Sequence, residues 1–135
     1  MSGPVTRRRA VAVKIHCPIT AETLAALIAG DEAALERDAT AATILTVIRD
    51  DNPLGDFGHY KGVCEIAPGW ESFRPGPDAK PTLGTSGERS LSPTAILTTY
   101  ADAEADISAA LAALMAAHPW EVPVIELSEV NLLVR

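Results

Sequence analysis

Two short stretches of this chain carry side chains that could bind a metal ion or a polar ligand. The first is His16-Cys17, which follows an apolar, β-branched run. Imidazole and thiolate groups suit copper or zinc, so this pair is a candidate metal site. Neighbouring residues of a strand point to opposite faces, so both can bind one ion only if the strand has already ended. His118, in the second stretch, is the third candidate metal ligand.

The second stretch is His118-Pro119-Trp120-Glu121-Val122-Pro123. Its prolines set the path of the chain between a helical and an extended segment, because proline locks its own φ and restricts the residue before it. His118 could bond the last free carbonyls of the preceding helix, or line an intersubunit cleft with Glu121 and bind a ligand. Trp120 could anchor an interface or stack on a ligand.

Proline and glycine punctuate the segment 68–93, and we expect one long irregular loop there. A loop of that length in a compact domain is usually functional, disordered or ordered by a partner subunit. Arg74 within it could hold a phosphate or carboxylate, with a solvated loop as the alternative. The chain has no GxSxG motif and no P-loop lysine after its glycines, so the sequence identifies no catalytic residue.

The composition indicates one globular domain. The chain has 135 residues and a net charge of −7, which argues against nucleic acid as a partner. No apolar run approaches the length of a membrane helix, and two widely spaced cysteines suit a reducing compartment, so we expect a cytoplasmic protein. We expect residues 1–9 to be a disordered tail and residues 10–135 to form the domain.

Hydrophobic patterns predict the order of the elements. Ala10–His16 is an expected strand, Thr20 an N-cap and Gly30 a helix stop, with a continuation from Asp31. The run 43–49 fits either a strand or the end of a helix, so the role of the segment 31–57 stays open. The remaining elements are expected strands at 59–66, 94–100 and 121–130, and a helix from an Asp102 N-cap to Ala117. This order predicts an α+β, ferredoxin-like βαββαβ sandwich with two helices on one face of an antiparallel sheet.

Two motifs carry a family resemblance. His118–Pro123 resembles the His-Pro-Tyr-Glu-Val-Pro signature of CutA, the divalent-cation-tolerance family. A loop in the CutA-like (PII-like) insert domain of the NGG-interacting-factor family is similar to a second pattern here. The matching positions are Gly58, Tyr60, Phe73-Arg74-Pro75, Pro81, Gly84 and Gly87. The chain departs from that motif at Val63, where a cysteine is expected, and at Glu71, where a glycine is expected.

The resemblance implies a PII/CutA-like homotrimer in which the long loop reaches a neighbouring subunit. It implies a binding or regulatory role, which could involve a divalent metal, copper or zinc. The residues it points to as ligand or interface groups are His118, Trp120, Glu121, Arg74 and Tyr60. Two alternatives remain: a small enzyme with an intersubunit active site under the long loop, and a purely structural accessory oligomer.

Overall fold

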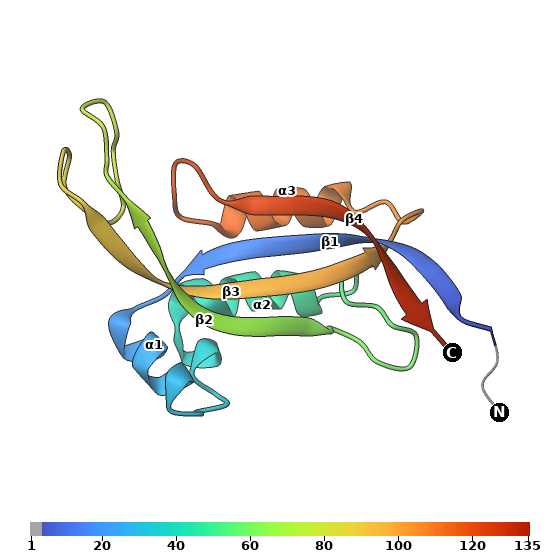
Figure 1. Ribbon diagram of the computed structural model, residues 1–135. Helices are drawn as coiled ribbons and strands as arrows, with labels where there is room; N and C mark the ends of the chain where they lie inside the picture. The colour runs from blue at the N-terminus through green and yellow to red at the C-terminus, as the bar shows by residue number, and fades with distance from the viewer. Residues whose placement is uncertain (1–3) are drawn as a thin grey trace.

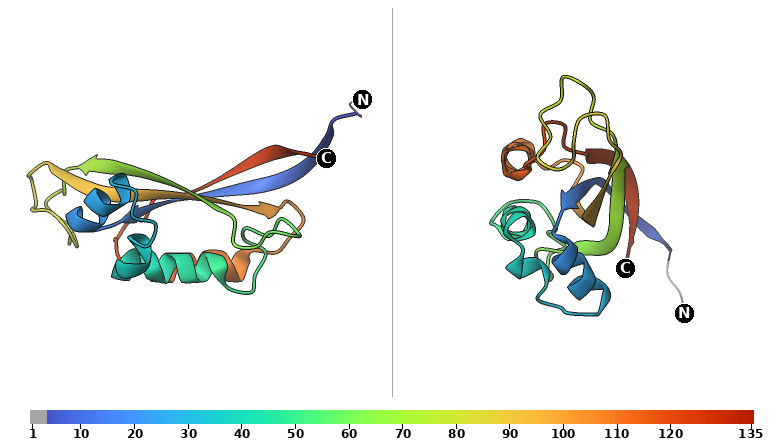
Figure 2. Two further views of the ribbon diagram at one scale, coloured as in Figure 1. Left: turned by 90° about the horizontal axis from the view of Figure 1, so that it is seen from below. Right: turned by 90° about the vertical axis from the view of Figure 1, so that its left-hand side faces the viewer.

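The structure, a computed structural model, describes residues 4–135 as a four-stranded antiparallel sheet with helices on one face (Figures 1 and 2). The strands are β1 (Thr6–Pro18), β2 (Cys64–Phe73), β3 (Ser90–Asp102) and β4 (Ile125–Val134). The helices are α1 (Ala21–Ile28), α2 (Ala39–Arg49) and α3 (Ser108–Ala117), with a 3-10 turn at Leu35–Arg37. The strand order β2-β3-β1-β4 confirms the expected ferredoxin-like arrangement.

The core lies between the two central strands and the helices. On β1, the side chains of Val13, Ile15 and Cys17 share one face, as the alternation of a strand requires, and all three are buried. The rest of the core comes mainly from Leu24 of α1, Ile44, Leu45 and Ile48 of α2, Ala95, Leu97 and Ala101 of β3, and Ala110 and Leu114 of α3. The opposite face of the sheet carries no helix in the described chain (Figure 2).

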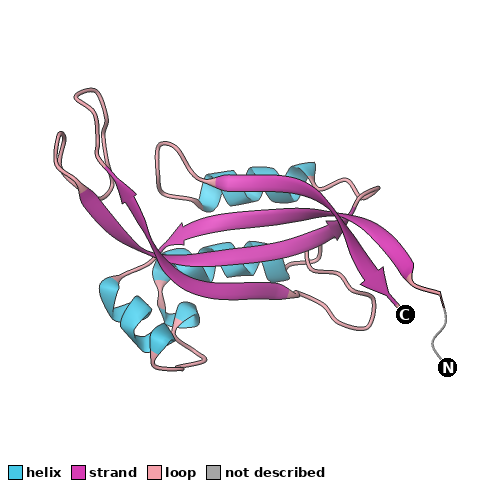
Figure 3. Cartoon of the chain, viewed as in Figure 1, coloured by secondary structure: helices cyan, strands magenta, loops and turns pink. Residues whose placement is uncertain are grey.

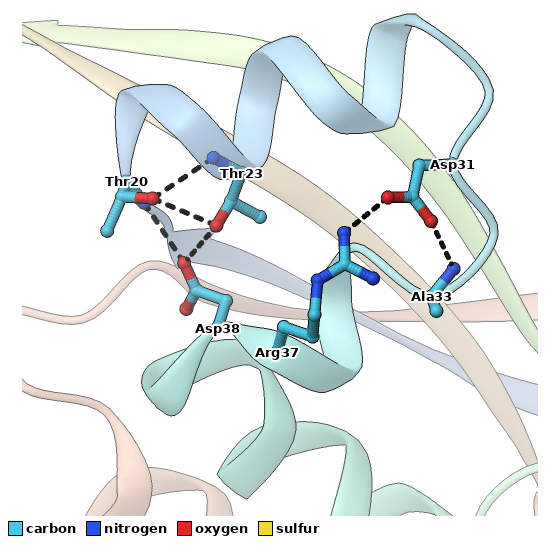
Figure 4. Close-up of polar contacts among 6 residues, drawn as sticks. All are labelled: Thr20, Thr23, Asp31, Ala33, Arg37 and Asp38. Carbon is cyan, nitrogen blue, oxygen red and sulfur yellow. Dashed lines mark hydrogen bonds and ion pairs between the residues drawn. The ribbon is translucent and has the colours of Figure 1, made fainter.

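The run 43–49 is part of a helix, α2, so the described chain has a third helix beyond the two expected. Asp38 is its N-cap, and Oδ1 accepts a hydrogen bond from the Ala41 N–H at 3.0 Å. The other oxygen, Oδ2, accepts bonds from the Thr20 N–H at 3.1 Å and from the Thr23 hydroxyl at 2.8 Å (Figure 4). One buried carboxylate therefore joins the first turns of α1 and α2.

The expectation of one irregular loop over residues 68–93 is wrong at both ends. Pro68 pairs with Ala95 and Phe73 with Ser90, so β2 and β3 extend into a long hairpin and leave a loop of residues 74–89 (Figure 3). The prediction failed because Pro68, Gly69 and Pro93, which favour a loop, lie within strands β2 and β3. β2 is an edge strand, where a proline is tolerated because one side of the strand has no ladder partner.

Several element boundaries also differ from expectation. β1 begins at Thr6, which pairs with Val134, so residues 6–9 belong to the sheet instead of a disordered tail, while residues 1–3 lie outside the described chain. The last strand, expected at 121–130, is β4 and lies at Ile125–Val134. Asp102 is not the N-cap of α3, which begins six residues later at Ser108.

The expected limits of the first helix are confirmed. The Thr20 hydroxyl accepts a bond from the Thr23 N–H at 3.0 Å, and α1 ends two residues before Gly30, whose φ is +87°. None of the helices within residues 4–135 is both long enough and apolar enough to cross a membrane.

Candidate ligand site

The His118–Pro123 stretch meets the loop part of the second motif at the tip of the β2–β3 hairpin, although the two are far apart in the sequence. The Thr82 hydroxyl donates a hydrogen bond to the Pro119 carbonyl at 3.0 Å, and the Lys80 N–H donates to Glu121 Oε1. The rings of Phe73 and Trp120 lie 5.3 Å apart between centroids, tilted by 60°. These contacts hold the loop 74–89 against the connection between α3 and β4.

A cavity of about 270 Å³ lies between the loop and that connection. Its lining comes from the end of β2 and the loop (Glu71, Ser72, Phe73, Pro75, Ala79, Pro81, Thr82, Leu83) and from the connection (Trp120, Glu121, Val122). Most of these side chains are apolar or aromatic, and the charged ones are both carboxylates. An apolar cavity with a few polar groups is the usual form of a small-molecule site.

Glu71 is the unusual side chain of this cavity. Its Oε1 lies 3.7 Å from His16 Nδ1, too far for a hydrogen bond. Its Oε2 is buried and accepts no hydrogen bond from any residue of the described chain. A buried carboxylate oxygen without a donor costs free energy, because it has lost its hydration and gained nothing in exchange. Glu71 therefore lines the cavity with a carboxylate whose second oxygen has no partner, and a donor in the cavity would satisfy that oxygen once the carboxylate turns toward it.

His118 is buried and has both ring nitrogens engaged by backbone groups. Nε2 lies 2.8 Å from the His16 carbonyl, which can only accept, so Nε2 donates. Nδ1 then accepts from the Trp120 N–H at 3.3 Å. This neutral tautomer joins the end of α3 to β1 and orients Trp120. The geometry favours a structural role for His118. Its ring donates to a carbonyl of β1 and does not bond the last carbonyls of its own helix.

His16 and Cys17 point to opposite faces of the sheet, because β1 continues through Pro18. Cys17 is fully buried among the core residues, and that burial, followed by the charge of Asp38, raises the pKa of its thiol to about 12. The expected metal set of His16, Cys17 and His118 is therefore not assembled around one point. Within residues 4–135, no three His, Cys, Asp or Glu side chains are grouped as metal ligands.

The other two expected site residues lie outside the cavity. Arg74 is exposed and follows Phe73 directly, at the edge of the loop, without being part of the lining. Tyr60 is exposed in the connection that leads into β2. That connection is bonded to the opposite end of β3, where the Gly55 N–H donates to the Tyr100 carbonyl at 2.7 Å. The structure therefore joins Trp120 and Glu121 at one site, with Arg74 beside it and Tyr60 remote.

Sequence reasoning missed Glu71 and Phe73 as site residues. Phe73 belongs to the second motif, in which only Arg74 and Tyr60 are expected site residues. Glu71 had one signal, since it occupies a position where the motif has glycine. What that carboxylate contacts depends on the folding of the hairpin tip, which no local pattern predicts.

The fold defines the chain as a ferredoxin-like α+β protein, and comparison with known proteins agrees at that level. No protein-family model and no curated protein matches the chain. Among solved structures, the chain is similar to a Bacillus cereus protein related to NIF3, with a TM-score of 0.60 over 95% of this chain and 15% sequence identity. The match spans only 27% of that protein's chain. At an identity this low, the match shows a shared fold alone, so any function has to be inferred from the residues of the site.

Proposed function

We propose that this chain is a CutA/PII-like binding or regulatory protein, one domain per subunit, that takes a small ligand in the cavity at the hairpin tip. The observation that carries the proposal is that residues of the His118–Pro123 stretch line this cavity together with Phe73, Pro75 and Pro81 of the second motif. Glu71, Phe73, Trp120 and Glu121 are the residues to which we assign ligand contact. The two free thiols support the cytoplasmic compartment expected from the sequence.

We also propose that the protein is a trimer. Trp70 is 57% exposed, Leu91 62% and Ile66 44%. Ser72 pairs with Leu91, so the alternation of the strands places these three side chains on one face of the hairpin. Neighbouring exposed apolar side chains of this size are typical of an association surface. The exposed apolar face of the hairpin, meaning Ile66, Trp70 and Leu91, is the surface we assign to contact between subunits.

Fluorescence of Trp120 tests the binding role directly. The chain has two tryptophans, so a Trp70→Phe background leaves Trp120 as the single reporter. We would titrate copper, zinc, ATP and ADP, together with three small aromatic compounds: phenethylamine, 2-phenylethanol and phenylacetate. We expect a saturable change with at least one organic compound, because Trp120 lines the cavity.

A cavity-filling variant gives the control. Ala79 lines the cavity, so Ala79→Phe should abolish the response, whereas Ala113→Phe on the exposed side of α3 should leave it unchanged. No saturable response to any compound would overturn the proposed binding role and favour the structural, accessory alternative. A response to copper or zinc alone that survives Ala79→Phe would indicate a metal bound at the edge of the cavity instead of a ligand inside it, with His16 and Glu71 as the first residues to mutate.

A further inference from the structure

We infer that the ligand of this cavity is an organic cation, an ammonium group carried on an aromatic or otherwise apolar body. The inference rests on the proposed function and adds the chemical class of the ligand. It comes from three properties of the cavity: the sign of its charges, the unsatisfied oxygen of Glu71 and the aromatic corner formed by Phe73 and Trp120.

The charges of the cavity favour a positive ligand. Glu71 and Glu121 both line it, and no lysine, arginine or histidine is among its described lining residues. His16 stands outside the lining, on the Oε1 side of Glu71. The Lys80 backbone N–H engages one oxygen of Glu121 but brings no formal charge. An anionic ligand would be placed against two carboxylates in a partly dehydrated space, where their repulsion is strong.

Glu71 Oε2 is a hydrogen-bond acceptor without a donor in the described chain. The oxygen is buried, lies on a residue that lines the cavity and has no partner among residues 4–135. An ammonium N–H would satisfy it with a charge-assisted bond, which is stronger than a bond between neutral groups. A neutral hydroxyl could donate as well, but it adds no positive charge of its own. The difference in affinity between an amine and an alcohol therefore measures the contribution of the ligand's charge.

The remaining walls select an organic body over a bare metal ion. Phe73, Pro75, Pro81, Leu83 and Trp120 present apolar or aromatic surface and no ligand atoms for a metal. The tilted rings of Phe73 and Trp120 form a corner in which a ring can pack and a cation can lie over an aromatic face. The volume of about 270 Å³ is slightly below the usual range for drug-sized ligands and suits one ring with a short chain.

The test compares three compounds that share the phenyl ring and a short side chain and differ mainly in the charge of the polar group. Phenethylamine, 2-phenylethanol and phenylacetate are titrated at pH 7.5 into the Trp70→Phe protein, with Trp120 fluorescence as the readout. We expect the amine to bind on the order of 10-fold more tightly than the alcohol, because both can donate a hydrogen bond to the carboxylate but only the amine adds a positive charge. Phenylacetate should bind most weakly of the three.

Glu71→Gln keeps the size of the side chain and removes its charge, so the advantage of the amine over the alcohol should fall, and only the charge of Glu121 should still favour the amine. Glu65→Gln is the matched control. It changes a glutamate of the same strand that accepts a bond from the Tyr100 hydroxyl at 2.8 Å and is not part of the lining. The two positions are six residues apart, roughly 20 Å along a strand. This variant should retain the full preference for the amine.

The outcomes separate the inference from the proposed function. Equal binding of the amine and the alcohol, or tighter binding of phenylacetate, would overturn the cation and leave the binding role standing. No binding by any of the three, together with no response to nucleotides or metals, would overturn both. If Glu71→Gln changes the oligomeric state seen by light scattering, a basic side chain of a second copy occupies the cavity and the small-molecule cation is overturned. If Glu71→Gln does not fold, the amine–alcohol comparison in the unmutated cavity still decides the matter.

Discussion

At the scale of single residues, the side chains that first suggested metal chemistry are tied into the fold. His118 uses both ring nitrogens on backbone groups, and Cys17 is sealed in the core. The buried side-chain oxygen left without a hydrogen-bond partner in the described chain is Oε2 of Glu71, a residue that no spacing rule singles out.

We predict that His118→Ala destabilises the protein by about 2–3 kcal/mol, because it leaves the His16 carbonyl and the Trp120 N–H without their partner. Urea unfolding followed by circular dichroism measures the change. His59→Ala is the control, since His59 is exposed, and it should change stability by less than about 0.5 kcal/mol. Equal effects of the two substitutions would contradict the structural role of His118 and return it to the ligand candidates.

We predict that neither thiol reacts readily with a disulfide reagent at pH 8 in the folded protein. Burial raises the pKa of Cys17 to about 12 and that of Cys64 to about 11, from an ordinary 9.0, so both remain protonated and poorly nucleophilic. Both should react at once in guanidinium chloride. Because the folded chain keeps protons that the unfolded chain loses above pH 9, stability should also fall as the pH rises from 9 toward 12. Rapid labelling of the native protein at pH 8 would contradict this account.

At the scale of elements, the third helix is attached through one carboxylate. Asp38 caps α2 and also accepts two bonds from the first turn of α1 (Figure 4). The segment between the first helix and the second strand, which the sequence left unassigned, is therefore an ordered part of the helical layer. Its helix α2 supplies Ile44, Leu45 and Ile48 to the core.

We predict that Asp38→Ala lowers stability by about 2–3 kcal/mol, from the lost N-cap and the buried donors left unpaired. Asp31→Ala is the matched control. Asp31 also accepts a backbone bond, from the Ala33 N–H at 3.0 Å, and pairs with Arg37, but its contacts are at the surface. A surface ion pair contributes little, so the loss should be clearly smaller. Thermal and urea unfolding compare the two variants, and a larger effect of Asp31→Ala would refute the role given to Asp38.

In the whole molecule, one face of the sheet carries no helix in the described chain (Figure 2). The hairpin presents exposed apolar side chains. The tip of the same hairpin closes the ligand cavity. Association through the hairpin would therefore restrain the loop 74–89 that forms one wall of the site. The proposed trimer and the proposed site are coupled through this one element.

We predict that light scattering after size exclusion gives a mass three times that of the 14.2 kDa chain. Trp70→Glu should lower this mass, because it places a charge in the exposed apolar face of the hairpin. Met115→Glu replaces another exposed apolar side chain, 53% exposed on α3, and should leave the mass unchanged. A monomer for the unmutated protein would refute the trimer, and an equal effect of both variants would refute the assignment of the surface.

Local sequence patterns predict the class of fold and several element boundaries, since caps, breaks and apolar alternation depend on neighbours in the chain. The Thr20 cap, the stop at Gly30 and the turn to an extended chain at His118-Pro119 follow from such local preferences. Contacts between distant segments determine that the run 43–49 is a helix, that prolines and a glycine lie within β2 and β3, and that Glu71 and Trp120 line one cavity. These features depend on pairing and burial between distant segments, whose free energy outweighs local propensity and leaves no periodic trace in the sequence.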